Sequence, residues 1–140
     1  MFELHTQLDK DTVPIGDLEL CRVLLMNDAN YPWLVLVPRR EEVSEIFQLT
    51  TIDQQRLMAE ISTVAAALAA HYRADKINIG ALGNIVPQLH VHIIARYQDD
   101  AVWPRPVWGA TITRNYADEM LAVTVSELRD LLATEGLDPV

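Results

Sequence analysis

The sequence feature that most constrains the fold is the alternation of apolar and other side chains over residues 88–96. Because successive side chains of a β-strand point to opposite faces, this pattern predicts a strand with one apolar face. That face comprises Leu89, Val91, Ile93 and Ala95. The opposite face comprises Gln88, His90, His92 and Ile94. Neighbouring polar side chains are unfavourable on a buried face unless they are hydrogen-bonded, so we expect the second face to line a cleft or to carry a hydrogen-bond network.

Other segments predict the elements around this strand. Short apolar or alternating runs predict further strands at residues 18–26, 33–37 and 76–80. A long helix is predicted over residues 51–73, because Thr51 and Gln54 have the spacing of a capping box. The apolar residues that follow recur every three or four positions, at Leu57, Ile61, Val64, Leu68 and Tyr72.

A second helix is predicted to begin at a cap formed by Asn115 and to stop near Gly136. Strands that are close together in the chain, with two helices apart from them, predict an α+β fold. The expected architecture is a mainly antiparallel sheet of about five strands with one long and one C-terminal helix.

Length and composition indicate a single domain over residues 1–140, because the chain has no internal repeat or linker. Eleven Lys and Arg residues and 20 Asp and Glu residues give a formal net charge of −9. This charge disfavours nucleic acid and anionic membranes as partners. Cys21 is the one cysteine of the sequence, so no disulfide can form within the chain. The first ten residues carry no secretory signal, and we therefore expect a cytoplasmic protein. No apolar run approaches the roughly 20 residues that span a bilayer.

The two histidines of the predicted strand, His90 and His92, lie two positions apart and therefore on one face. Three interpretations fit this spacing. The pair could bind a metal with a third ligand, could be hydrogen-bonded for structural reasons, or could perform nucleophilic catalysis at phosphorus. Imidazole suits the last role because it is mostly neutral near pH 7 and can also move protons. The spacing alone does not choose among them.

The segment Gln88-Leu-His90-Val-His92-Ile-Ile resembles the motif of the histidine triad (HIT) family, with glutamine in place of the first histidine. The resemblance extends over about residues 15–97. It includes Ile77–Asn84, which is similar to the glycine-rich approach to the triad, and Tyr31–Pro38, which is similar to a strand of the family's sheet. The resemblance implies an α+β nucleotide hydrolase or transferase that forms a homodimer and needs no metal or other cofactor.

The resemblance also implies roles for individual residues. His90 matches the histidine that attacks the α-phosphorus and forms a nucleotidyl-histidine intermediate, and His92 matches the one that contacts phosphate oxygens and favours departure of the leaving group. Asn84 matches an amide side chain that contacts the phosphate or the leaving group. The remaining positions implied in nucleotide binding are Asn27 or Asp28 at the ribose, Asn78, and Gln88.

Three positions depart from the family pattern: Gln88, Trp33 and Ile85. Trp33 corresponds to a histidine that pairs with the first triad histidine in many members, so we expect a new packing contact or hydrogen bond there, for example from its indole N–H to the Gln88 carbonyl. Ile85 replaces a hydroxyl side chain and leaves only its backbone N–H as a donor. We also expect a backbone carbonyl to accept a hydrogen bond from Nδ1 of His90, which leaves Nε2 as the nucleophile.

Residues 103–108 contain two tryptophans, an arginine and two prolines. We favour packing of this segment over the sheet or a partner subunit above stacking of an aromatic ring on a nucleobase. Arg39, Arg40 and Arg96 are expected to be solvated surface charges, with a local role at the end of the active strand as the alternative for Arg96. The predicted function is nucleotide hydrolysis at the α-phosphorus of a nucleoside polyphosphate or phosphoramidate through His90, and the alternative is a nucleotide-binding or interaction module with little or no catalysis.

Overall fold

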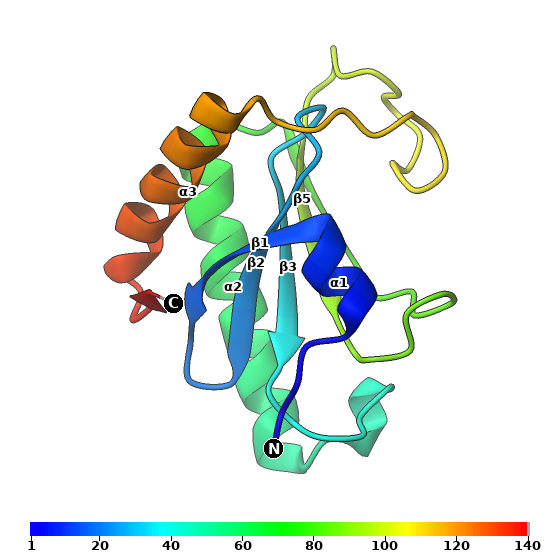
Figure 1. Ribbon diagram of the computed structural model, residues 1–140, viewed down its shortest axis with the longest axis vertical. Helices are drawn as coiled ribbons and strands as arrows, with labels where there is room; N and C mark the ends of the chain where they lie inside the picture. Colours follow the sequence, from blue (N-terminus) through cyan, green and yellow to red (C-terminus); the bar gives the residue numbers. More distant parts are fainter. Residues whose placement is uncertain (140) are drawn as a thin grey trace.

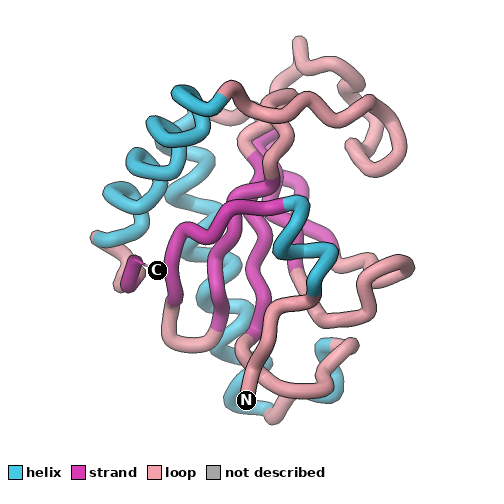
Figure 2. The backbone as a smooth tube through the Cα atoms, in the orientation of Figure 1, coloured by secondary structure: helices cyan, strands magenta, loops and turns pink. Residues whose placement is uncertain are grey.

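The structure is a computed structural model and describes residues 1–139. Its centre is a six-stranded sheet in the order β4-β5-β3-β2-β1-β6, in which every neighbouring pair is antiparallel (Figures 1 and 2). The strands are β1 (Thr12–Asp17), β2 (Cys21–Met26), β3 (Trp33–Pro38), β4 (Lys76–Gly80), β5 (Val91–Arg96) and β6 (Asp138–Pro139). The helices are α1 (Thr6–Asp11), η1 (Ile46–Gln48), α2 (Thr51–Tyr72) and α3 (Asp118–Ala133). The predicted α+β fold is confirmed.

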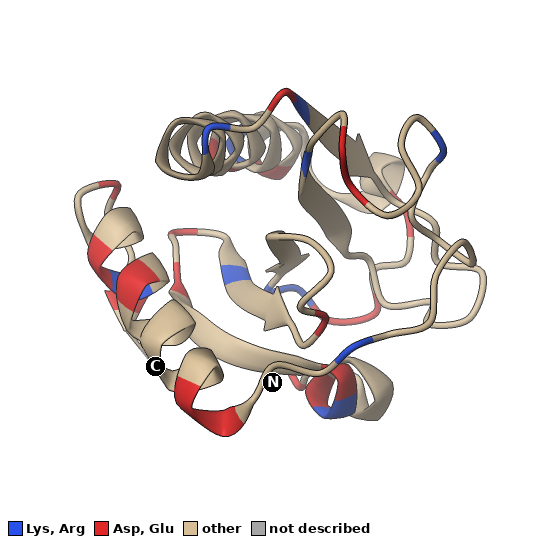
Figure 3. Ribbon diagram, turned by 90° about the horizontal axis from the view of Figure 1, so that it is seen from above, with Lys and Arg blue, Asp and Glu red and all other residues tan. Residues whose placement is uncertain are grey.

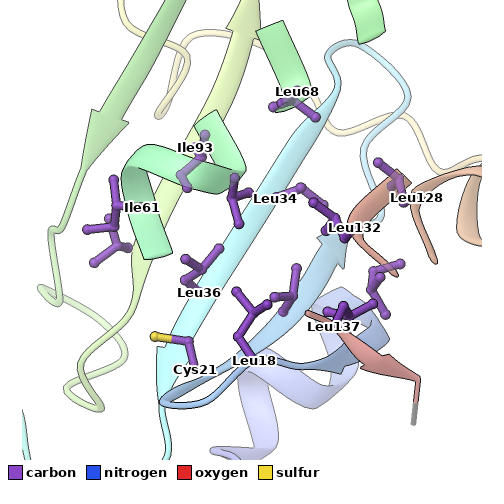
Figure 4. Close-up of a cluster of buried hydrophobic side chains, with 14 of the residues drawn as sticks. Leu18, Cys21, Leu34, Leu36, Ile61, Leu68, Ile93, Leu128, Leu132 and Leu137 are labelled. Carbon is purple, nitrogen blue, oxygen red and sulfur yellow. The ribbon is translucent and has the colours of Figure 1, made fainter. Parts of the chain in front are cut away.

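The helices α2 and α3 cover one face of the sheet, and the exposed face of α3 is acidic (Figure 3). Apolar residues of both helices pack with those of the central strands in one buried cluster, part of which is drawn in Figure 4. Leu34 and Leu36 of β3 and Ile93 of β5 lie in this cluster and are fully buried. The apolar face predicted for the 88–96 segment is the face that α2 covers, and none of the helices among residues 1–139 is long and apolar enough to cross a membrane.

The opposite face of the sheet carries a second apolar cluster. Trp33 and Val35 of β3 and Ile94 of β5 belong to it, together with Leu8 of α1 and Val107 of the long connection between β5 and α3. Figure 1 shows α1 in front of the sheet and this connection beyond the upper ends of the strands. The second face is therefore covered by a short helix and a loop rather than by long helices, which leaves room for a cavity.

Several predicted boundaries were wrong by a few residues. Thr50, not Thr51, caps α2, because its Oγ1 accepts a hydrogen bond from the backbone N–H of Asp53 at 3.1 Å. The cap of α3 is Ala117 rather than Asn115. The strand β5 begins at Val91, so Gln88, Leu89 and His90 lead into the strand without belonging to it.

The N-terminal elements α1 and β1 had no counterpart in the sequence prediction. The strand β1 contains Pro14 and Gly16, which sequence rules place at strand edges and bulges, and its pairing with β2 is irregular between these two residues. The helix α1 has only six residues. A helix of that length shows no apolar periodicity, so its position is decided by contacts with the rest of the fold.

Candidate functional site

A cavity of about 470 Å³ opens on the face of the sheet opposite α2 and α3. His90 and His92 lie in its wall, together with Asp28, Asn84, Trp33 and Trp108. These six side chains come from β5 and the segment before it, from the start of β3, and from the connections that follow β2, β4 and β5. The register of β3 and β5 explains why Trp33 and His92 are in contact. Trp33 is opposite Ile94, and Val35 is opposite His92. Trp33 and His92 are therefore diagonal neighbours on one face of the sheet.

The ring of His90 is oriented by the backbone. Its Nδ1 lies 2.6 Å from the carbonyl oxygen of Gln88. Because a carbonyl can only accept, Nδ1 must carry the hydrogen. In the neutral ring the Nε2 atom then holds a free lone pair. The predicted orientation of His90 by a backbone carbonyl is confirmed.

The ring of His92 is held in the opposite tautomer. The indole Nε1–H of Trp33 donates to Nδ1 of His92 at 3.0 Å. An indole nitrogen can only donate, so Nδ1 of His92 accepts and the hydrogen of the neutral ring is on Nε2. The expected hydrogen bond from Trp33 to the Gln88 carbonyl was wrong, because the register of β3 and β5 brings Trp33 to His92 and the carbonyl of Gln88 accepts from His90 instead.

The environment of His92 keeps it neutral. Burial first, and then the neighbouring His90, lower the pKa of His92 to about 4. The two imidazole centroids are 5.0 Å apart. Trp33 and Trp108 pack edge-on against His92, with ring centroids at 5.6 and 5.3 Å. His92 is thus a neutral Nε2–H donor near neutral pH, beside the Nε2 atom of His90.

The segment of residues 103–108 packs against the sheet and also lines the cavity. Val107 is buried against the sheet, as the packing interpretation expected, and Trp108 reaches the cavity wall. Trp108 also approaches Gly80 at the end of β4, where a Cβ atom would lie 3.0 Å from its ring. The absence of a side chain at Gly80 therefore permits the position of Trp108.

Two of the predicted nucleotide-binding residues lie in the cavity wall. Asp28 is 4% exposed, and its Oδ1 accepts hydrogen bonds from the backbone N–H and the side-chain amide of Asn30 at 3.0 and 2.8 Å. Asn84 lies in the glycine-containing turn before β5. The structure thus brings Asp28 and Asn84 together with the two histidines.

The other three predicted residues have their side chains engaged elsewhere. Oδ1 of Asn27 accepts from the backbone N–H of Tyr116 at 2.9 Å, and Oδ1 of Asn78 accepts from Arg96 at 2.8 Å. The side chain of Gln88 bonds to the backbone of residues 3 and 5. None of these three residues lies in the wall of the cavity that holds His90 and His92.

The expectation that Arg96 is a solvated surface charge was wrong. Its side chain is 1% exposed and forms two hydrogen bonds with the carboxylate of Asp100, at 2.7 and 3.1 Å. The guanidinium holds the pKa of Asp100 at about 2, against the opposing effect of burial. The same carboxylate accepts hydrogen bonds from the backbone N–H groups of Tyr97, Val102 and Trp103. Arg96 therefore holds the carboxylate around which the loop after β5 is organised.

Sequence reasoning missed one wall of the cavity. Gln7, Leu8 and Asp11 of α1 lie in it, and no sequence signal pointed to them because α1 itself was not expected. The ionisable residues of the lining, apart from the histidines, are Asp11 and Asp28, and the part of the lining that the structure describes includes no lysine or arginine. Among residues 1–139, no group of three His, Cys, Asp or Glu side chains is placed to hold a metal ion.

The protein is thus an α+β domain whose antiparallel sheet is covered by helices on one face. The other face carries a cavity with two neighbouring histidines in its wall. Residues 7–99 match the family model of the HIT domain. No curated protein matches the chain. The chain therefore belongs to the histidine triad family, whose members are generally nucleotide-binding proteins and hydrolases.

Solved structures agree with this assignment. The chain is similar to a histidine triad protein from Bradyrhizobium japonicum, with 52% identity, a TM-score of 0.89, and coverage of 92% of this chain and 96% of that one. It is similar to a histidine triad protein from Sinorhizobium meliloti, with 46% identity, a TM-score of 0.90 and 98% of both chains covered. A histidine triad protein from Marinobacter aquaeolei is 46% identical, with a TM-score of 0.93 over 96% of this chain and 98% of that one.

Proposed function

We propose that this protein hydrolyses a nucleoside polyphosphate or phosphoramidate at its α-phosphorus, with Nε2 of His90 as the nucleophile. The observation that carries this proposal is the pair of opposite tautomers in one cavity wall. His90 has a lone pair on Nε2, and His92 has a hydrogen on Nε2. A nucleophile beside a fixed donor suits attack on phosphorus, where positioning and stabilisation of oxygen charge supply most of the catalysis.

The first step forms a bond between Nε2 of His90 and phosphorus and breaks the bond to the leaving group, which departs with the electron pair and takes a proton from solvent. The attached imidazole becomes positively charged, and its Nδ1–H donates to the Gln88 carbonyl more strongly than in the neutral ring. A water molecule then attacks phosphorus and gives a proton to solvent, the bond from phosphorus to Nε2 breaks, His90 leaves as the neutral ring, and the nucleoside monophosphate is released.

His92 supports both steps as a hydrogen-bond donor rather than as an acid. With its pKa at about 4, His92 is uncharged near neutral pH, and a neutral imidazole does not readily give up its remaining proton. Its Nε2–H is suited to a phosphate oxygen or to the leaving atom. Replacement of His92 should therefore slow substrates with poor leaving groups more than those with good ones.

Asp28 is proposed to hold the ribose hydroxyls, since it is a buried carboxylate in the cavity wall, and Asn84 to donate to the phosphate or leaving group. The apolar and aromatic part of the wall, including Trp33, Trp108 and Val107, suits a nucleobase.

The test is rapid-quench trapping of a protein–nucleotide adduct with an α-labelled substrate. The wild-type protein should form an acid-labile adduct that disappears at the rate of product formation. His90→Asn should form no adduct and should turn over at least about a thousandfold more slowly, as is typical when a nucleophile is removed. His71→Asn, at a histidine on α2 outside the cavity, is the matched control and should behave as wild type.

Unchanged turnover in His90→Asn would contradict the covalent mechanism. Nucleotide binding by the wild-type protein without any adduct would instead support the alternative function, a nucleotide-binding module with little or no catalysis.

We further propose that the active form is a homodimer joined along β4. Within residues 1–139, β4 pairs with β5 on one side only, and its exposed residues include Ile79, which is 51% exposed. An unpaired edge strand that presents an apolar side chain is usually covered. Sedimentation equilibrium should give twice the chain mass, and Ile79→Lys should shift the protein toward monomer. A monomeric mass for the wild-type protein would contradict the proposal.

A further inference from the structure

The segment before β1 is tied to the approach to β5 by one side chain. The Oε1 atom of Gln88 accepts a hydrogen bond from the backbone N–H of His5 at 2.8 Å. Its Nε2 atom donates to the backbone carbonyl of Glu3 at 2.8 Å. One amide thus bridges a backbone donor and a backbone acceptor of residues 3–11, which we call the N-terminal arm. A carboxylate or an imidazole could not make both bonds in the same way, because a carboxylate has no donor and an imidazole lacks the amide's paired geometry.

The arm continues directly into the wall of the nucleotide cavity. His5 caps α1, because its Nδ1 accepts from the backbone N–H of Gln7 at 3.0 Å. The next residues, Gln7, Leu8 and Asp11, line the cavity. Leu8 is 3% exposed and packs in the apolar cluster beneath the cavity, so the arm is held at its start by Gln88 and in its middle by Leu8.

Gln88 also contacts the nucleophile of the proposed function. Its backbone carbonyl accepts from Nδ1 of His90, while its side chain holds the arm. The same residue therefore fixes the His90 ring and one wall of the cavity in front of it.

The charge of that wall has a consequence for the ligand. Asp11 accepts from Nε2 of Gln7 at 3.1 and 3.0 Å, which holds its carboxylate at the cavity. Asp28 supplies a second carboxylate, and the described part of the lining supplies no lysine or arginine to offset them. Each additional phosphate group that enters the cavity adds like charge next to these carboxylates.

We propose that the N-terminal arm is the specificity wall of the cavity and that Gln88 is the positioning residue that holds it there. Asp11 on this wall weakens the binding of each further phosphate group, so that among the proposed substrates those with fewer phosphates bind more tightly. The inference rests on the proposed function for the nature of the ligand. The hold of Gln88 on the arm does not depend on catalysis and can be measured without a ligand.

The first experiment is backbone hydrogen exchange of residues 3–11, measured by mass spectrometry. Gln88→Glu keeps the acceptor for His5 but places a carboxylate oxygen against the Glu3 carbonyl. The arm should exchange about three- to tenfold faster in this variant, the effect expected of one lost hydrogen bond. Gln98→Glu makes the same change at an exposed glutamine outside the cavity and should leave exchange of the arm unchanged. Equal exchange of the arm in Gln88→Glu and the wild type would overturn the role of Gln88.

The second experiment compares the affinities of AMP and ATP by calorimetry, with GMP and GTP as a second pair. Asp11→Asn should strengthen binding of the triphosphates about two- to fivefold and leave the monophosphates nearly unchanged, as expected for removal of one partly screened charge. Asp9→Asn makes the same change on α1 outside the cavity wall and is the matched control.

An equal response of the triphosphates to Asp11→Asn and Asp9→Asn would overturn the selectivity. If the wild-type protein binds neither kind of nucleotide, the proposed function and the selectivity both fail, while the exchange experiment still decides whether Gln88 holds the arm.

Discussion

The buried His92 should make the stability of the protein depend on pH in a predictable way. Its pKa is lowered from 6.5 to about 4 in the folded protein, first by burial and then by His90. Above pH 6.5 the ring is neutral in both the folded and the unfolded chain, and its contribution to stability is fully present. As the pH falls from about 6.5 toward 4, the unfolded chain takes up a proton that the folded protein does not, so stability is lost.

The size of this effect follows from the two pKa values. Between pH 7 and pH 5, proton uptake at this one ring should lower the free energy of unfolding by about 2 kcal/mol, and the loss should level off near 3 kcal/mol below pH 4. The assay is urea unfolding followed by fluorescence at a series of pH values. His92→Asn is the key variant, because its amide oxygen can still accept from Trp33 while it cannot titrate.

The wild-type protein should lose about 2 kcal/mol more than His92→Asn between pH 7 and pH 5. His71→Asn controls for the loss of an imidazole elsewhere in the chain. Trp33→Phe should lie between the wild type and His92→Asn, because a protonated Nδ1 no longer faces an N–H donor at 3.0 Å and the folded ring is easier to protonate. Identical pH dependence in the wild type and His92→Asn would refute the assignment of a buried, neutral His92.

Two further predictions concern the supports of the site. Arg96→Ala should lower the free energy of unfolding by about 3–5 kcal/mol, because it leaves the carboxylate of Asp100 buried without its cation, whereas Arg105→Ala, at an exposed arginine of the same loop, should change it little. Urea unfolding distinguishes them, and equal effects would contradict the buried ion pair. Gly80→Ala should displace Trp108, because the new methyl group would lie 3.0 Å from its ring. The free energy of unfolding should fall by about 1–3 kcal/mol and the tryptophan fluorescence should shift. An unchanged fluorescence spectrum would contradict the contact.

The alternation over residues 88–96 was sufficient to predict which residues of β5 face the helices. It depends only on the geometry of a strand and on the transfer of apolar side chains from water, both of which are local properties. The long helix was predictable for the same reason, since Leu57, Ile61, Val64 and Leu68 follow the helical period and are all buried.

The sequence by itself also predicted that His90 and His92 are neighbours, and the two rings do lie side by side, although β5 begins only at Val91. The sequence could not decide what each ring nitrogen does, because that depends on partners that are distant in the chain. Trp33 fixes the tautomer of His92 from 59 positions away, and this contact exists only because of the register between β3 and β5.

The wall formed by α1 was likewise decided by the tertiary structure alone. A six-residue helix has too few hydrogen bonds to be stable by itself, so its local sequence carries almost no signal. Its place comes from Leu8 in the second apolar cluster and from the side chain of Gln88, 83 positions from the His5 amide that it binds. Local periodicity thus determined the strands and the long helix, while contacts across the sheet determined the protonation, the walls and the charge of the cavity.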